Sequence, residues 1–149
     1  MTDKTILVLG AGPGIGRHVT SLFASKLYTN VVLIARRAEH LEVEKKAIEA
    51  AVGRRVNVKT YAVDTSDTED FLAALDDADA AFGKPEVVFY NAARVLPSDF
   101  FDHPVEDIEY DLRVSSSPYS LICSSLTRLR SGQRQCSVHP LAAVPTVPR

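Results

Sequence analysis

The sequence is poor in cysteine, lacks tryptophan and contains no long apolar run. Its two cysteines, Cys123 and Cys136, are spaced neither as a Cys-x-x-Cys pair nor as a zinc pattern among the 149 residues. No stretch approaches the ~20 apolar residues of a membrane-spanning helix, and the N-terminus lacks the regions of a secretory signal. These absences exclude a disulfide scaffold. They predict a cytoplasmic protein with free thiols, no metal site and no membrane partner.

Acidic residues and lysines are missing from the C-terminal part. All 19 acidic residues and 12 of the 17 lysines and arginines lie within residues 1–112, whereas residues 113–149 hold five arginines and no acid. Such asymmetry is typical of a basic arm or of a change in sequence origin. Because aromatic residues do not alternate with the arginines, the pattern gives little support to nucleic-acid binding.

The sequence alternates regularly between short apolar runs and segments whose apolar residues have helical spacing. Short apolar runs predict strands at 6–9, 31–35, 56–63 and 86–90, and helical spacing fills the segments between them. Gly53 and Gly83 mark two helix ends, and Ser66 with Glu69 has the spacing of a capping box. This alternation predicts an α/β protein with a doubly wound parallel sheet of the Rossmann type.

The regular pattern stops after Leu112, where serine, proline and arginine become frequent. A helical pattern covers 105–112, and residues 121–129 have the spacing of one amphipathic helix. Beyond Gly132 neither period is visible. We therefore expect an incomplete dinucleotide-binding domain at 1–114 and a Ser/Pro/Arg-rich tail at 115–149 that is disordered or aberrant in origin.

A glycine-rich loop follows the first strand and opens the first helix. Its members are Gly10, Gly12, Gly14 and Gly16, with Ile15 before the last glycine. Glycines permit positive φ and let a backbone approach a pyrophosphate closely, while the helix N-terminus offers N–H groups and partial positive charge. The alternative is a tight turn without a ligand.

The second strand ends in Ala35 and is followed by Arg36 and Arg37, with no acid before Glu39. Dinucleotide domains place an acid here for a ribose 2′-hydroxyl, or a basic residue for a 2′-phosphate. Because a guanidinium binds a phosphate that a carboxylate repels, NADP(H) is favoured over NAD(H). The alternative is a pair of solvated arginines at a helix start.

Polar and small residues also follow the third and fourth strands. Asp64 and Thr65 come after the third strand, and Asn91, Ala92 and Ala93 come after the fourth. Open α/β sheets bind ligands at the carboxyl ends of their strands, and small residues leave room for a cofactor. Taken alone, Asp64 is also compatible with an ordinary turn residue.

With these motifs in order, residues 4–115 resemble the short-chain dehydrogenase/reductase family. The loop glycines 10, 14 and 16 match its Gly-xxx-Gly-x-Gly motif, Asp64 its adenine-contacting acid, Asn91–Ala93 its Asn-Ala-Gly motif, and Arg36 its NADP-type basic position. The resemblance implies strand order 3-2-1-4 and an NADP(H)-dependent oxidoreductase. It also implies that the full-length protein acts on a small-molecule carbonyl or alcohol.

The chain departs from the family in its catalytic residues. The family's catalytic Asn would fall near Ser115, and no Lys follows Lys84, so no Tyr-xxx-Lys pair exists after the fourth strand. In the family the Tyr is a general acid whose pKa the Lys lowers. We therefore predict no catalytic residues here, and a chain that binds cofactor without turnover.

Three origins are compatible with the sequence of the tail at 115–149. The tail is explained by a truncated or mis-spliced product, by a natural short form, or by a genuine basic arm. The corresponding functional alternatives are a non-catalytic NADP(H)-binding or interaction protein and a non-functional fragment. In each case we expect the fourth strand to lack its outer neighbour, and the family's oligomer interface to be missing.

Overall fold

The computed structural model describes residues 3–93 and 104–127. Strands and helices alternate along the chain: β1 Lys4–Leu9, α1 Ile15–Lys26, β2 Tyr28–Ala35, α2 Ala38–Val52, β3 Asn57–Ala62, α3 Thr68–Phe82, β4 Val87–Tyr90 and α4 Val105–Thr127. The four strands form a parallel sheet in the order β3-β2-β1-β4, which confirms the predicted fold class. Because neighbouring strands end together, with Leu9 beside Ile34 and Tyr90, the segments that follow them meet at one edge.

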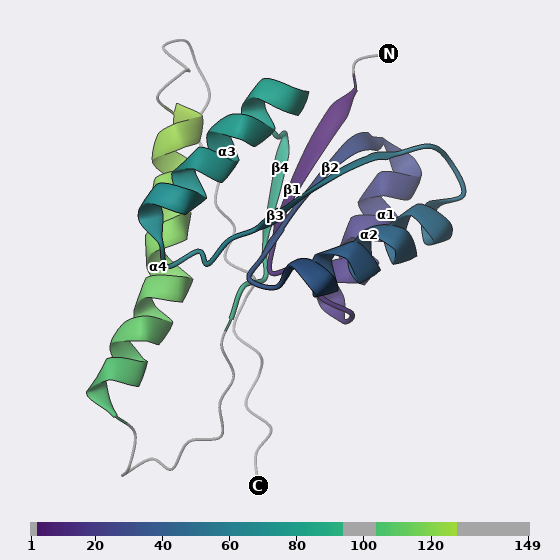
Figure 1. Ribbon diagram of the computed structural model, residues 1–149. Coiled ribbons are helices and arrows are strands. Elements are labelled where there is room, and N and C mark those ends of the chain that lie inside the picture. Colours follow the sequence, from purple (N-terminus) through teal and green to yellow (C-terminus); the bar gives the residue numbers. More distant parts are fainter. Residues whose placement is uncertain (1–2, 94–103, 128–149) are drawn as a thin grey trace, which may run out of the picture.

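Helices cover both faces of this sheet, with α1 and α2 on one face and α3 and α4 on the other (Figure 1). Both faces of the central strands are therefore buried: all but the first residue of β1 is buried, and so are five consecutive residues of β2. This arrangement explains why those strands read as continuous apolar runs in the sequence rather than as alternating patterns.

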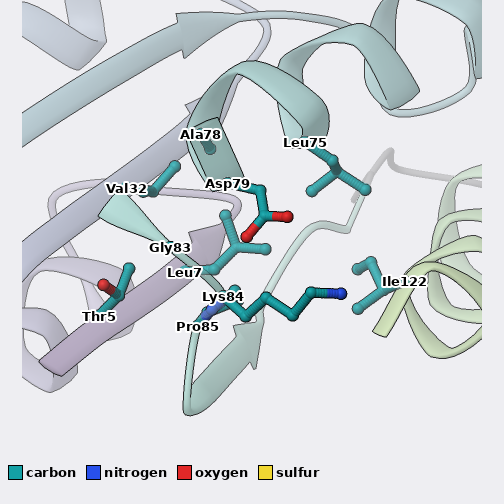
Figure 2. Close-up of a pocket in the computed structure, with 10 residues that line it drawn as sticks. All are labelled: Thr5, Leu7, Val32, Leu75, Ala78, Asp79, Gly83, Lys84, Pro85 and Ile122. Atoms are coloured by element: carbon teal, nitrogen blue, oxygen red, sulfur yellow. The ribbon is translucent and has the colours of Figure 1, made fainter. Parts of the chain in front are cut away.

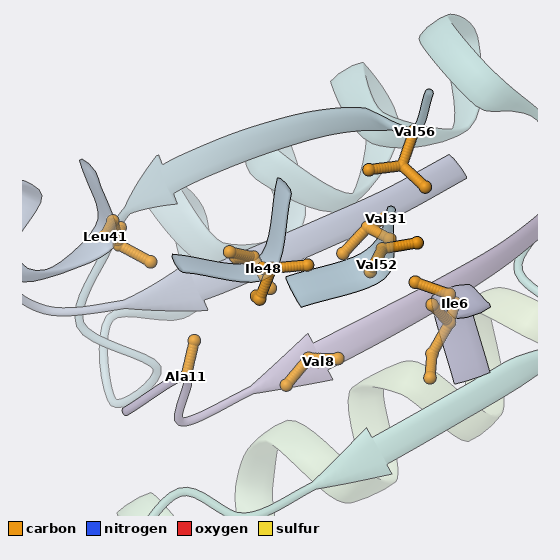
Figure 3. Packing of buried hydrophobic residues seen from close by; sticks show 10 residues of the cluster. Ile6, Val8, Ala11, Val31, Leu41, Ile48, Val52 and Val56 are labelled. Atoms are coloured by element: carbon orange, nitrogen blue, oxygen red, sulfur yellow. The ribbon is translucent and has the colours of Figure 1, made fainter. Parts of the chain in front are cut away.

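The core beneath α1 and α2 joins side chains from the sheet and from one side of each helix. Val8 and Val31 of the sheet pack with Leu41, Ile48 and Val52 of α2 (Figure 3). The helical residues are spaced at seven and four positions, which places them on one face. Burial of this face is the main stabilising contribution to the α2–sheet contact.

Helix ends follow local chemistry, with one difference from the prediction. Gly53 ends α2 with a left-handed φ of 65°, as expected of a C-terminal glycine. The predicted capping box at Ser66 and Glu69 is wrong. Asp67 caps α3 instead, because its carboxylate accepts from the backbone N–H groups of Glu69 and Asp70, and Ser66 is hydrogen-bonded to Asp64.

The last described helix is longer than the sequence indicated. We expected separate helical patterns and a tail from residue 115, whereas α4 runs without a break through Pro118 to Thr127. Val114, Pro118 and Ile122 are buried at intervals of four residues, so one face of α4 packs against the molecule, with Ile122 in the core beside α3. The predicted tail beyond Thr127 lies outside the described residues.

Each outer strand of the described sheet has a neighbour on one side. Among the described strands β4 pairs only with β1, and β3 pairs only with β2. On the face of α4 away from the core, Val105, Ile108 and Leu112 are exposed. No helix in the described parts of the chain has the length and apolar character needed to cross a membrane.

Candidate cofactor site

Close packing imposes glycine at two positions of the loop after β1. Gly10 has φ of 80°, and a Cβ there would lie 2.6 Å from backbone atoms of Asn91 and Ala92. A Cβ on Gly16 would lie 3.0 Å from the Gly10 carbonyl oxygen. The loop therefore sits directly against the end of β4, and Asn91 fixes this contact by donating from its Nδ2 to the Gly10 carbonyl at 3.3 Å.

The other two loop glycines have no such requirement. A Cβ added at Gly12 or Gly14 would meet no atom within 4 Å, and neither residue has positive φ. Gly14 is the N-cap of α1 without any side-chain capping bond, and the first turn of α1 contains no acid. Next to it, the Ile15 side chain is 66% exposed. This end of α1 presents an uncapped, uncrowded backbone of the kind that accommodates an anion.

Beside this loop, the carboxyl edge of the sheet contains a hollow of about 190 Å³. Its lining comes from the segments after all four strands and from α4: Gly10, Ala11, Ile34, Ala35, Arg36, Arg37, His40, Val63, Asp64, Thr65, Asn91, Ala92, Ala93 and Val114. The structure thus brings together the residues predicted after β2, β3 and β4 with Gly10. Gly12, Gly14, Ile15 and Gly16 belong to the adjoining loop and helix start rather than to the lining.

Asp64 is the most extensively hydrogen-bonded side chain of the hollow. Its Oδ1 accepts from the Ser66 backbone N–H at 2.9 Å and from the Ser66 hydroxyl at 2.7 Å, while its Oδ2 accepts from the Tyr110 hydroxyl at 2.9 Å. Partial burial alone raises the pKa of the Asp64 carboxyl. The bonds from Ser66 and Tyr110 and the charge of Arg36 outweigh that effect and hold the pKa below its usual value. Asp64 is therefore a carboxylate at neutral pH.

Sequence reasoning missed the contributions of three residues. Tyr110 belongs to none of the motifs predicted from the sequence, yet its hydroxyl contacts Asp64 and Arg36. His40 and Val114 line the hollow without belonging to any recognisable motif. His40 lies in the first turn of α2, three residues after the N-cap Arg37. Nothing in the sequence indicated that α4 would return to the sheet edge with Tyr110 and Val114.

Tyr90, at the end of β4, is held in a structural role. Its hydroxyl donates to the Val114 carbonyl of α4. Burial raises the pKa of the Tyr90 phenol, against a smaller opposing effect from its hydrogen bond with Thr65. The phenol therefore stays protonated at neutral pH. It joins β4 and α4 behind the hollow, and Thr65 itself is buried.

A second, smaller cavity of about 30 Å³ lies at the opposite edge of the sheet, between α3 and α4 (Figure 2). Leu7, Leu75 and Ile122 supply apolar walls, and the polar groups of Thr5 are satisfied by Phe82 and Glu86. This cavity is a packing space far from the glycine loop. Across the described residues, no cluster of three or more His, Cys, Asp or Glu side chains is arranged to hold a metal ion.

The parallel sheet, the glycine loop and the hollow beyond the strand ends define a Rossmann-type nucleotide-binding fold. The family model for short chain dehydrogenases matches residues 4–138. The chain belongs to the short-chain dehydrogenase/reductase family.

Individual relatives agree with this assignment. A short chain dehydrogenase/reductase of Colletotrichum higginsianum is 34% identical over 112 residues, which are 75% of this chain and 39% of the relative. The solved structure of an NAD+-bound xylitol dehydrogenase has a TM-score of 0.73 at 23% identity, covering 85% of this chain and 48% of that one.

L-sorbose reductase from Gluconobacter frateurii, solved with NADPH and L-sorbose, has a TM-score of 0.75 at 20% identity, covering 86% of this chain and 48% of that chain. These two structural likenesses establish the fold. The chain spans about half the length of these solved structures, and less of the Colletotrichum relative.

Proposed function

We propose that this chain binds NADP(H) at the carboxyl edge of its sheet, in preference to NAD(H). The observation that carries the proposal is the pair Arg36 and Arg37 in the lining of the hollow, directly after β2 and beside the glycine loop. No acid precedes Glu39 in this segment. Two guanidinium groups there favour a ribose 2′-phosphate, which a carboxylate would repel.

The remaining residues are suited to the other parts of the nucleotide. Gly12 and Gly14 leave open the space beside the uncapped start of α1, where a pyrophosphate would accept backbone N–H groups. Gly16 and Ile15 shape that turn, and the Asp64 carboxylate is an acceptor for an adenine amino group. Thr65, Asn91, Ala92 and Ala93 complete the wall with small or hydrogen-bonding groups.

The fold alone does not decide between the two nucleotides. Xylitol dehydrogenase was solved with NAD+ and L-sorbose reductase with NADPH, so the shared fold accommodates both nucleotides. In such enzymes the bound nicotinamide supplies or accepts a hydride, and the protein supplies orientation and proton transfer. For the whole protein we propose oxidoreductase activity on a small carbonyl or alcohol.

For the 149 residues themselves we propose cofactor binding without turnover. They contain no Tyr-xxx-Lys sequence, and none of the five tyrosines is followed by Lys at the fourth position. The proton donor that the family resemblance implies is therefore missing from these residues. The second candidate function is that the protein as a whole binds NADP(H) without being an enzyme. The missing Tyr-xxx-Lys sequence supports this candidate too. NADPH oxidation above a protein-free blank with common carbonyl substrates would contradict both proposals of inactivity.

The test of cofactor preference is a fluorescence titration of the purified chain with NADPH and with NADH, repeated on Arg36→Ala. We expect the substitution to weaken NADPH binding by about tenfold or more, since a charge-assisted phosphate contact contributes about 1.5–3 kcal/mol. NADH affinity should change little. Arg55→Ala is the matched control, because Arg55 is exposed and precedes β3 at the opposite sheet edge. Equal affinity for both nucleotides in the unsubstituted chain would overturn the preference.

A further inference from the structure

The hydroxyl of Tyr110 in α4 contacts two charged residues that line the hollow, Arg36 and Asp64. Tyr110 lies in the second turn of the helix, and its hydroxyl donates to Asp64 Oδ2 at 2.9 Å. The same oxygen accepts from Arg36 Nη1 at 3.4 Å. The phenol of Tyr110 therefore bridges Arg36, which follows β2, and Asp64, which follows β3. Through it, α4 is joined to the carboxyl ends of two strands.

The direction of these hydrogen bonds is fixed by chemistry. Asp64 is a carboxylate and can only accept, and a guanidinium can only donate. The hydroxyl hydrogen of Tyr110 must therefore point to Asp64, and its lone pairs face Arg36. Because Ser66 holds the other carboxylate oxygen with two hydrogen bonds, the plane of the carboxylate is set before Tyr110 adds its contact.

The phenol also separates two opposite charges. Arg36 is close enough for its charge to act on Asp64, yet the ion pairs among the described residues join Arg17 to Glu44 and Lys59 to Asp77. A direct Arg36–Asp64 pair would draw the guanidinium away from a phosphate and compensate its charge. A neutral hydroxyl between the two groups orients Arg36 and leaves its charge less compensated by Asp64 than a direct ion pair would.

We propose that Tyr110 is a positioning residue for cofactor selection, whose hydroxyl holds Arg36 at the hollow and apart from the Asp64 carboxylate. This inference rests on the proposed NADP(H) site and deepens it. Tyr110 acts through Arg36, so its contribution should reach only the ligand that carries a 2′-phosphate. Asp64 keeps its two bonds to Ser66, so contacts common to both nucleotides should survive the loss of the hydroxyl.

The experiment is Tyr110→Phe in the full chain, titrated with NADPH and NADH. We expect NADPH affinity to fall about three- to tenfold, the size of one net hydrogen bond, and NADH affinity to change less than twofold. In an Arg36→Ala background the Tyr110→Phe effect on NADPH should disappear, because the two groups act on the ligand through one contact. Equal weakening of both nucleotides, or an undiminished effect without Arg36, would overturn the inference.

Tyr61→Phe is the matched control. Its hydroxyl also donates to an aspartate carboxylate, Asp77 Oδ2 at 2.7 Å, but neither residue lines the hollow. That variant should leave the ratio of the two affinities unchanged. A change in the ratio as large as that of Tyr110→Phe would show a general effect on folding and would overturn the inference.

A second readout needs no cofactor and separates this inference from the proposed function. The readout is the pKa of the Asp64 carboxyl, followed by NMR titration of its side-chain carbon in an Arg36→Ala background, where no guanidinium can move onto the carboxylate. There the loss of the Tyr110 hydrogen bond should raise the pKa of Asp64, because that bond and the Arg36 charge both lower it. If the unsubstituted chain binds neither nucleotide, the proposed function fails. The Asp64 titration then still tests the hydrogen bond from Tyr110, and an unchanged Asp64 pKa on adding Tyr110→Phe to Arg36→Ala would overturn the inference.

Discussion

At the scale of single residues, the glycine loop contains two kinds of glycine. Gly10 is required by the fold, since its φ is positive and a Cβ would meet backbone atoms of the β4 end at 2.6 Å. Gly12 satisfies no such need, because its surroundings are open. Both are glycines of the same loop, and the geometry separates a glycine that permits packing from one that leaves room for a ligand.

Gly10→Ala should therefore destabilise the chain. We expect the free energy of unfolding to fall by about 1–3 kcal/mol, the range for forcing a residue with a side chain into a strained backbone conformation. The clash adds to this effect, because the neighbouring atoms are backbone and cannot rotate away. Urea denaturation followed by circular dichroism measures the change. A Gly10→Ala variant as stable as the unsubstituted chain would contradict the described loop.

Gly12→Ala should have the opposite profile. The free energy of unfolding should stay within about 0.5 kcal/mol, as is usual for a substitution away from packed features, while NADPH affinity falls because the methyl group occupies the space proposed for the pyrophosphate. The same denaturation and a nucleotide titration test both parts. Unchanged affinity would remove the loop from the proposed binding site.

How far the site could be predicted depends on distance along the chain. Arg36, Asp64 and Asn91 were predicted because each directly follows a strand whose apolar run is easy to identify. The contact between Asp64 and Tyr110 joins residues 46 positions apart. It depends on where α4 lies after a segment outside the described residues, and local spacing contains no information about that placement.

At the scale of elements, α4 shows where sequence periodicity is overridden. Pro118 and the surrounding serines interrupt the helical pattern, so the sequence indicated a change of structure near residue 115. In the structure the helix continues, and Val114, Pro118 and Ile122 are buried on one face. Tertiary burial thus offsets the missing hydrogen bond and the steric clash of an interior proline. The apolar runs predicted β1 and β2 well because their residues are buried on both faces of the sheet.

Pro118→Ala should stabilise the chain. Removing an interior proline relieves a penalty of about 3 kcal/mol, and the smaller buried side chain costs about 1–2 kcal/mol in lost apolar contact. We expect a net gain of about 1–2 kcal/mol in the free energy of unfolding. Thermal denaturation should show a higher midpoint. Ser116→Ala, at an exposed position of the same helix, is the control and should change stability by only a few tenths of a kcal/mol. A Pro118→Ala variant less stable than this control would indicate that the proline ring is needed for packing.

At the scale of the whole molecule, the two edges of the sheet differ in how they meet solvent. β3 carries Lys59, which pairs with Asp77 at 2.7 Å, and a charged edge strand resists pairing with other chains. β4 is entirely apolar or aromatic, its residues are only partly buried, and among the described strands it has a neighbour on one side. Stability should accordingly decline from the centre of the sheet toward β4.

Hydrogen–deuterium exchange tests this gradient and the independence of the chain together. We expect the slowest exchange in β1 and β2, which are paired on both sides and buried on both faces, and faster exchange in β3 and β4. Such a pattern would mean that these residues form a cooperative unit able to build the hollow between their strand ends. Fast exchange throughout β1 and β2 would instead favour a fragment that does not fold alone, because no arrangement of Arg36, Asp64 and Tyr110 persists without the central strands that align them. Nucleotide binding would then require the additional length that its relatives possess.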